Sequence, residues 1–146
     1  MKIAIDAMGG DHAPEQIVLG AIAAARAYDT QIVLVGQEEV VRAELAKHLP
    51  NGDPRITVQH AEQVVLMTDM PSQIVRGKRH SSLHEGLKLV KDGSCDAFYS
   101  AGNTGAVMAT ANLILRTMDG IDRPAIATIL PSLTGHSVMI DSGANV

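Results

Sequence analysis

The sequence contains few aromatic residues and few positive charges. Its aromatic side chains are Tyr28, Phe98 and Tyr99, and tryptophan is absent. Proteins that bind single-stranded nucleic acids stack bases on aromatic rings, and proteins that bind duplexes neutralise phosphates with lysine and arginine. This chain has 12 lysines and arginines against 16 acidic residues, which leaves a net charge of -4. The composition therefore argues against a nucleic-acid-binding protein.

Cysteine, metal-ligand patterns and long apolar runs are also scarce. The single cysteine, Cys95, excludes an internal disulfide and is typical of a small core residue. The histidines show no H-E-x-x-H spacing, and His80 and His84 are interpreted as exposed, so we predict no metal site. No apolar run approaches the ~20 residues that cross a bilayer, and residues 1–6 resemble a strand rather than a signal peptide. We therefore expect a cytoplasmic protein.

Alternating strand and helix patterns fill most of the chain. Strands are expected at 3–5, 31–35, 55–59 and 95–100, and apolar residues at helical spacing occur at 14–28, 41–49, 71–75, 81–93 and 105–118. This order predicts a mainly parallel sheet with helices on both faces. The first helix has an expected core stripe of Ile17, Val18, Ala21, Ile22, Ala25 and Tyr28, and the last one of Val107, Ala111, Ile114, Leu115 and Met118.

The final strands, 124–130 and 137–141, differ from the others. Only residues 131–136 separate them, too few for a helical crossover, so we expect an antiparallel hairpin inside the same sheet. The predicted fold is a three-layer α/β/α arrangement with a mixed, mainly parallel sheet. Residues 142–146 form a glycine-containing turn of the kind that precedes a helix, and no helix follows. This is the pattern of a truncated chain.

Two glycine-containing turns follow strands and precede helices. They are MGGD at residues 8–11 and SAGNTGA at residues 100–106. Open α/β sheets bind ligands at the carboxyl ends of their strands, and helix N-termini attract phosphate. Neither turn matches G-x-G-x-x-G or the P-loop, so a nucleotide is not indicated. Phosphate binding and an ordinary structural turn both remain open, and Asp11 is also a candidate helix cap.

A basic run, Arg76, Lys78, Arg79 and His80, stands out in an acidic chain. Such runs are usually solvated loops. The alternative is a docking patch for an acidic partner or a phosphate, because local positive charge speeds the encounter with anions.

The two turns, together with GIDRPA at 120–125 and GANV at 143–146, resemble the phosphate acyltransferase family of bacterial phospholipid synthesis. The four motifs occur in the family's order, and the resemblance covers the whole chain. Relatives usually carry an apolar residue where this chain has Ser142. Family members are much longer, so residues 1–146 are expected to be the N-terminal part of one catalytic domain.

The resemblance implies that a fatty acyl group moves from acyl-carrier protein to inorganic phosphate. It further implies a fold similar to the isocitrate dehydrogenase and phosphotransacetylase groups, a cytoplasmic homodimer with loose membrane association, and no organic cofactor. The acyl phosphate would feed a membrane glycerol-3-phosphate acyltransferase.

With this chemistry in view, the expected phosphate cradle consists of Ser100, Gly102, Asn103, Thr104 and Gly105. The expected catalytic groups are Asn103, Thr104 and Asn145, the cleft wall is Gly9, Gly10 and Asp11, and the carrier-docking residues are Arg76, Lys78 and Arg79. Two alternatives remain: a non-catalytic fragment that binds phosphate or carrier protein, and a metal- and NAD-dependent hydroxyacid dehydrogenase of related fold. The second needs clustered acidic ligands, for which Asp11 and Asp141 alone are insufficient.

Overall fold

A computed structural model describes residues 1–141 of the chain. The chain divides into two compact units, Met1–Arg116 and Thr117–Val146. No helix among the described residues is long and apolar enough to cross a membrane. The sequence pattern of residues 142–146, including Asn145, falls outside the described part.

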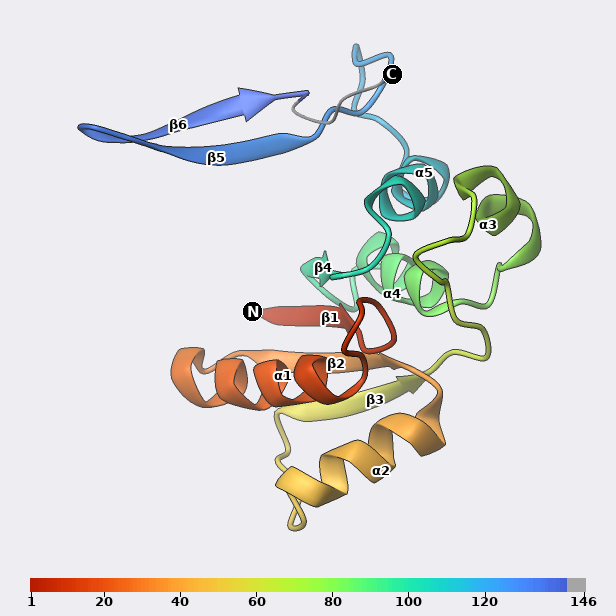
Figure 1. Cartoon of the computed structure of the whole chain (residues 1–146), viewed down its shortest axis with the longest axis vertical. Coiled ribbons are helices and arrows are strands. Elements are labelled where there is room, and N and C mark those ends of the chain that lie inside the picture. Colours follow the sequence, from red (N-terminus) through yellow and green to blue (C-terminus); the bar gives the residue numbers. More distant parts are fainter. Residues whose placement is uncertain (142–146) are drawn as a thin grey trace. The chain divides into compact units, whose positions relative to one another are not determined.

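The first unit is built on a parallel sheet of four strands (Figure 1). The strands are β1 (Lys2–Asp6), β2 (Gln31–Gly36), β3 (Ile56–His60) and β4 (Ala97–Tyr99), in the order β3-β2-β1-β4. Ile5 pairs with Tyr99 in the register of β1 and β4. Asp6 is the last residue of β1, and Ser100 directly follows β4. The two residues therefore lie side by side at the carboxyl ends of neighbouring strands.

Helices cover both faces of this sheet, as the sequence predicts. They are α1 (Glu15–Tyr28), α2 (Glu38–His48), α3 (Pro71–Gly77), α4 (Ser82–Lys91) and α5 (Thr104–Ile114). One core cluster joins α1 and α2 to the sheet through Val18, Ile22, Leu34 and Val41. A second, containing Ala4, Val33 and Cys95, packs with Leu89 and Val90 of α4, and a third joins α3, α4 and α5. The three-layer arrangement with a mainly parallel sheet is thus confirmed.

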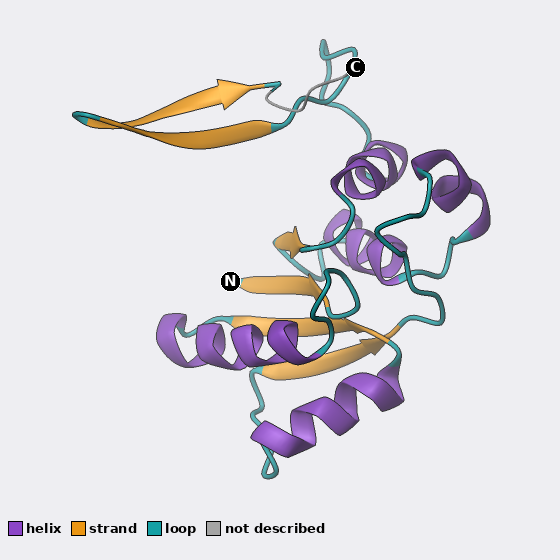
Figure 2. Cartoon of the chain, viewed as in Figure 1, coloured by secondary structure: helices purple, strands orange, loops and turns teal. Residues whose placement is uncertain are grey.

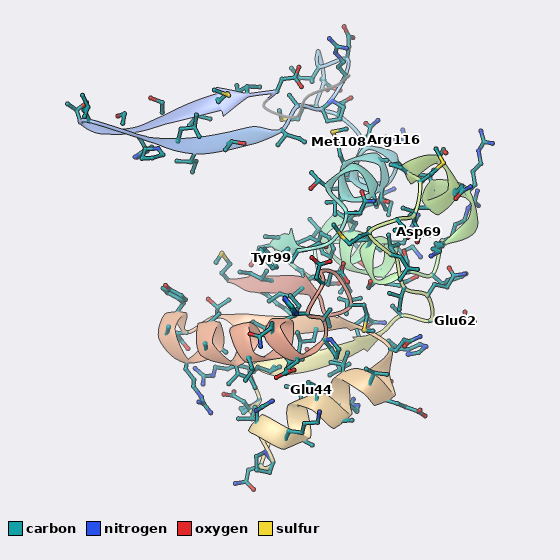
Figure 3. The ribbon with its side chains drawn as sticks, viewed as in Figure 1. Glu44, Glu62, Asp69, Tyr99, Met108 and Arg116 are labelled. Atoms are coloured by element: carbon teal, nitrogen blue, oxygen red, sulfur yellow. The ribbon has the colours of Figure 1, made fainter. Side chains whose placement is uncertain are left out.

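The buried faces of two helices differ from the expected stripes. Tyr28 ends α1 and is 77% exposed, because the chain turns away at Asp29. In α5 the buried residues are Ala106, Thr110 and Ile114. Ala106 and Thr110 each lie one position before an expected core residue, Val107 and Ala111. The helix ends at Ile114, so Leu115 and Met118 are exposed. Met108 lies on the exposed side of α5 (Figure 3).

The small buried residues of α5 explain the shift. Ala106 and Thr110 let the helix approach α3 and α4 closely. This close packing, and not the size of the apolar side chains that stay exposed, decides which face of α5 is buried.

The second unit contains an antiparallel hairpin, drawn as a twisted ribbon in Figure 2. Its strands are β5 (Ala127–Ser132) and β6 (Gly135–Ile140). The antiparallel pairing is confirmed, but the expected place inside the parallel sheet is wrong: within residues 1–141, β5 and β6 pair with each other alone. A hairpin needs only its own turn to form such a ribbon; here the turn is at residues 133–134, and Gly135 after it has a φ of 151°.

Candidate functional site

A buried aspartate and a serine join the carboxyl ends of β1 and β4. Asp6 is 2% exposed, and Ser100 Oγ donates a hydrogen bond of 2.8 Å to Asp6 Oδ2. The N–H of Met8 donates to the other carboxylate oxygen at 3.1 Å, and the N–H of Gly102 donates to Ser100 Oγ at 3.1 Å. One carboxylate therefore fixes both glycine turns.

The glycines of the two turns lie against each other above this pair. A Cβ on Gly9 would lie 2.3 Å from Asp6 Oδ2 and 2.9 Å from Ser100 Oγ. A Cβ on Gly102 would lie 3.3 Å from the Cα of Gly9. Gly10 has a φ of 106°, which favours glycine, and its own Cβ would lie 3.2 Å from the carbonyl oxygen of Ala101. The structure thus brings together two turns that the sequence presents separately.

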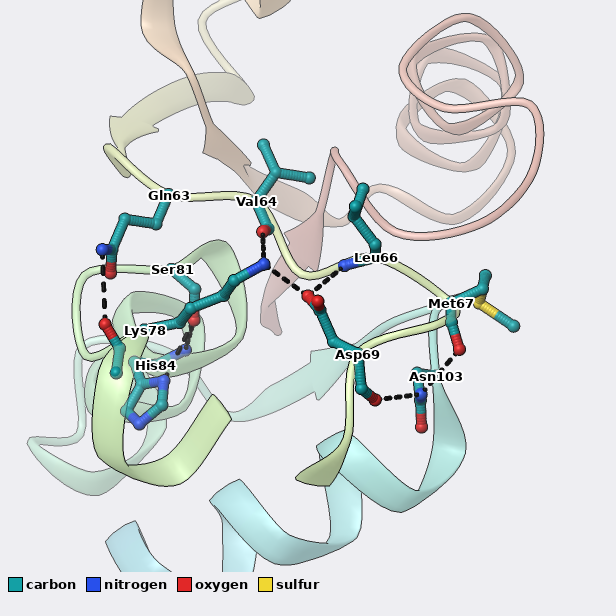
Figure 4. Close-up of polar contacts among 10 residues, drawn as sticks. Gln63, Val64, Leu66, Met67, Asp69, Lys78, Ser81, His84 and Asn103 are labelled. Carbon is teal, nitrogen blue, oxygen red and sulfur yellow. Dashed lines mark hydrogen bonds and ion pairs between the residues drawn. The ribbon is translucent and has the colours of Figure 1, made fainter. Parts of the chain in front are cut away.

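Asn103 holds the start of α5. Its side-chain oxygen accepts a hydrogen bond from the N–H of Ala106 at 3.0 Å, the geometry of an N-cap. Its Nδ2 donates to the carbonyl oxygens of Met67 at 3.0 Å and Asp69 at 3.2 Å (Figure 4). Both amide hydrogens are used within the protein, so Asn103 positions the helix terminus and the facing loop.

The first turn of α5 has open donors. Within residues 1–141, the N–H groups of Thr104 and Gly105 have no hydrogen-bond partner. Thr104 is exposed, and a Cβ on Gly105 would lie 3.2 Å from Cγ of Pro71. Unpaired N–H groups and the partial positive charge of a helix N-terminus favour an anion at this position.

The predicted basic run separates into two kinds of residue. Lys78 donates to the carbonyl oxygen of Val64 at 2.8 Å and forms an ion pair with Asp69, and this ammonium holds the pKa of the Asp69 carboxyl below its usual value. Arg76 and Arg79 are exposed and form no ion pair within the described residues. The two arginines are therefore available to an external anion, and Lys78 is engaged internally.

His84 is a buried residue that the sequence interpretation placed in solvent. It is 3% exposed, and its Nδ1 lies 3.0 Å from Oγ of Ser81, the N-cap of α4. Its Nε2 is buried without a partner in the described structure. Burial and the nearby Lys88 lower the pKa of the imidazole. The Ser81-x-x-His84 spacing at a helix start was the signal that could have revealed this contact.

The remaining predicted residues have no shared role in this arrangement. Asp11 is exposed and caps nothing, because α1 has Pro14 at its N-cap with no side-chain hydrogen bond. Residues 1–141 contain no group of three or more histidine, cysteine or acidic side chains placed to hold a metal ion. A cavity of about 400 Å³ lies beside α2 and β3 and shares no residue with the glycine turns. The predicted role of Asn145 lies outside the described residues.

Comparisons with known proteins agree with the resemblance seen in the motifs. A family model described as "Fatty acid synthesis protein" matches residues 1–146. The chain is 51% identical over 144 residues to the phosphate acyltransferase of Herpetosiphon aurantiacus, covering 99% of this chain and 39% of that protein. It is 50% identical over 147 residues to the phosphate acyltransferase of Hydrogenovibrio crunogenus, covering 100% and 43%.

A solved structure shares the fold. The phosphotransacetylase of Streptococcus pyogenes superposes with a TM-score of 0.65 at 22% identity, over 94% of this chain and 45% of that one. This likeness supports the architecture alone. The chain spans 39% to 43% of the length of the two curated relatives.

Proposed function

The chain belongs to the family described as fatty acid synthesis proteins, and we propose that it carries the phosphate-binding part of an enzyme that transfers an acyl group to inorganic phosphate. One observation carries the proposal: two glycine turns meet at the Asp6–Ser100 pair, next to the unpaired N–H groups at the start of α5. The names of the relatives from Herpetosiphon and Hydrogenovibrio support the same reaction.

In this proposal phosphate is the nucleophile, so no activated serine is needed. The hydroxyl of Ser100 donates into the Asp6 carboxylate and is covered by Gly9, which leaves it unsuited to attack a substrate. Ser100 and Gly102 shape the cradle, and the N–H groups of Thr104 and Gly105 bind the anion. Orientation of a bound nucleophile can lower a barrier by about 7–11 kcal/mol.

The acyl donor in this proposal is a thioester of acyl-carrier protein. A phosphate oxygen attacks the carbonyl carbon, a carbon–oxygen bond forms, the carbon–sulfur bond breaks, and the carrier leaves as a thiolate that takes up a proton. A helix N–H aimed at the developing oxyanion is typically worth about 2.7–4 kcal/mol. Thr104 and Asn145 remain the proposed catalytic groups, and Asn103 acts by fixing the turn.

We assign docking of the acidic carrier to the exposed cations Arg76 and Arg79, with Lys78 holding the loop that precedes them. The full proposal extends to a homodimer with peripheral membrane association. Its acyl phosphate supplies a membrane glycerol-3-phosphate acyltransferase in phospholipid synthesis.

A matched pair of glycine variants in the full-length protein tests the cradle. Gly102→Ala places a methyl group 3.2 Å from Ser100 Oγ and 3.3 Å from the Cα of Gly9, so these neighbours must move by a few tenths of an ångström. Because misplaced donors bind the anion poorly, we expect the phosphate KM to rise about tenfold in an acyl phosphate assay. Gly20→Ala in α1 meets nothing within 4 Å and is the control.

An unchanged phosphate KM and kcat in Gly102→Ala would refute the cradle assignment. Phosphate binding without any acyl phosphate formation by the unaltered protein would instead favour the binding-only alternative.

A further inference from the structure

The loop between β3 and α3 exposes three large apolar side chains close together in sequence. Leu66 is 55%, Met67 51% and Met70 60% exposed. Single apolar residues are common on protein surfaces, whereas a cluster of this kind marks a place where an apolar group binds. We refer to these three residues as the apolar loop.

The apolar loop is held from its inner side by polar contacts. The Asp69 carboxylate accepts a hydrogen bond of 2.8 Å from the N–H of Leu66 and also pairs with Lys78. The side chains of Leu66 and Met67 extend away from these bonds (Figure 4), and Figure 3 labels Asp69 on the same loop. The loop therefore presents apolar groups outward because its polar groups are already paired.

Its position is set by the same residue that caps α5. Nδ2 of Asn103 binds the carbonyl oxygens of Met67 and Asp69 at 3.0 and 3.2 Å. Thr104, with its unpaired N–H, is the next residue along the chain. Cγ of Pro71, which follows Met70, lies 3.2 Å from the position of a Cβ on Gly105. The apolar loop thus borders the proposed phosphate position.

We propose that Leu66, Met67 and Met70 bind the hydrocarbon chain of a straight fatty acyl donor. The inference rests on the proposed function, since acyl transfer to a phosphate at α5 requires the apolar chain to leave that polar position over a neighbouring surface. The family's description names fatty acid synthesis, which fits this occupant. Methionine adapts its shape to flexible apolar ligands, and two of the three residues are methionines.

The test compares acyl-chain lengths in the full-length protein. Thioesters of acyl-carrier protein with four-carbon and sixteen-carbon chains are supplied to Met67→Ser/Met70→Ser and to the unaltered protein. Each buried methylene contributes about a fourfold preference, so we expect kcat/KM for the sixteen-carbon donor to fall about tenfold or more. The value for the four-carbon donor should change by less than about threefold, and the phosphate KM should stay the same.

Two controls separate this role from folding and from general surface effects. Met67→Leu/Met70→Leu keeps the apolar surface and should retain the long-chain preference. Val40→Ser changes an exposed apolar residue of α2, which lies on the opposite side of the first unit from α5 in Figure 1, and should leave both donors unaffected.

An equal loss with both donors, or no loss with either, would overturn the inference. So would a changed sedimentation mass in the serine variant, because the apolar loop would then be an interface between copies of the chain. In these cases the acyl transfer itself stands. If the unaltered protein forms no acyl phosphate from either donor, the proposed function fails and the inference fails with it.

Discussion

Asp6 is the residue on which the site geometry depends most directly. It is buried, it accepts hydrogen bonds from Met8 and Ser100, and it lies 2.3 Å from the position of a Cβ on Gly9. The sequence shows Asp6 only as the end of a strand. Its partner Ser100 is 94 positions away, and the contact requires the register of β1 against β4, which no local pattern contains.

Asp6→Asn should destabilise the protein, because an amide has one acceptor oxygen where the carboxylate has two. Either Met8 N–H or the Ser100 hydroxyl then loses its acceptor, at a cost of about 1–3 kcal/mol in the free energy of unfolding. Urea denaturation measures this change. Asp11→Asn alters an exposed carboxylate and should stay within about 0.5 kcal/mol. Equal midpoints for the two variants would contradict the assigned role of Asp6.

At the scale of elements, the alternation of strands and helices was predictable and the faces of the helices were less so. The N-cap of α4 at Ser81 and the positive φ of Gly93 after the end of α4 are explained by local chemistry. The buried face of α5 depends on how closely α3 and α4 approach Ala106 and Thr110. How closely these helices approach one another depends on residues that are far apart in the sequence.

The start of α4 should make stability depend on pH. Burial and Lys88, with smaller contributions from Arg79 and His80 and an opposing one from Glu85, lower the pKa of His84 in the folded state. The unfolded chain therefore binds the proton first as the pH falls. Stability is full above the unfolded pKa of about 6.5 and decreases below it until the folded pKa is reached.

Urea midpoints at about pH 7.5 and about pH 5.5 measure this effect. His84→Leu removes the buried titrating group and should flatten the difference, whereas His12→Gln, at an exposed position, should preserve it. If His84→Leu and the unaltered protein lose stability equally, His84 is not the responsible group.

At the scale of the whole molecule, the two units differ in how they are stabilised. The first has three apolar clusters around a four-stranded sheet. The second has a hairpin whose large apolar side chains, including Ile129 and Val138, are exposed in the described structure. The short connection in the sequence predicted the hairpin, but its length does not determine which sheet the two strands join. The prediction of one catalytic domain stays a prediction.

Hydrogen–deuterium exchange of the 146-residue chain should resolve the two units. Amides of β1 and β2 are expected to exchange slowly, because their strands lie in the interior of the sheet. Those of β5 and β6 should exchange faster by about a hundredfold or more, since an isolated two-stranded hairpin is at best marginally stable in water. Matching protection in both pairs of strands would contradict this picture.

The meeting of the glycine turns across 94 positions of sequence also determines when in folding an anion site can exist. β1 is synthesised first, but its glycine turn has no partner until β4 joins the sheet, and long-range parallel pairing is a slow event. Under the proposed function, phosphate binds the completed sheet and not its precursors. By mass action, phosphate at the proposed site then favours the finished fold over partly assembled states.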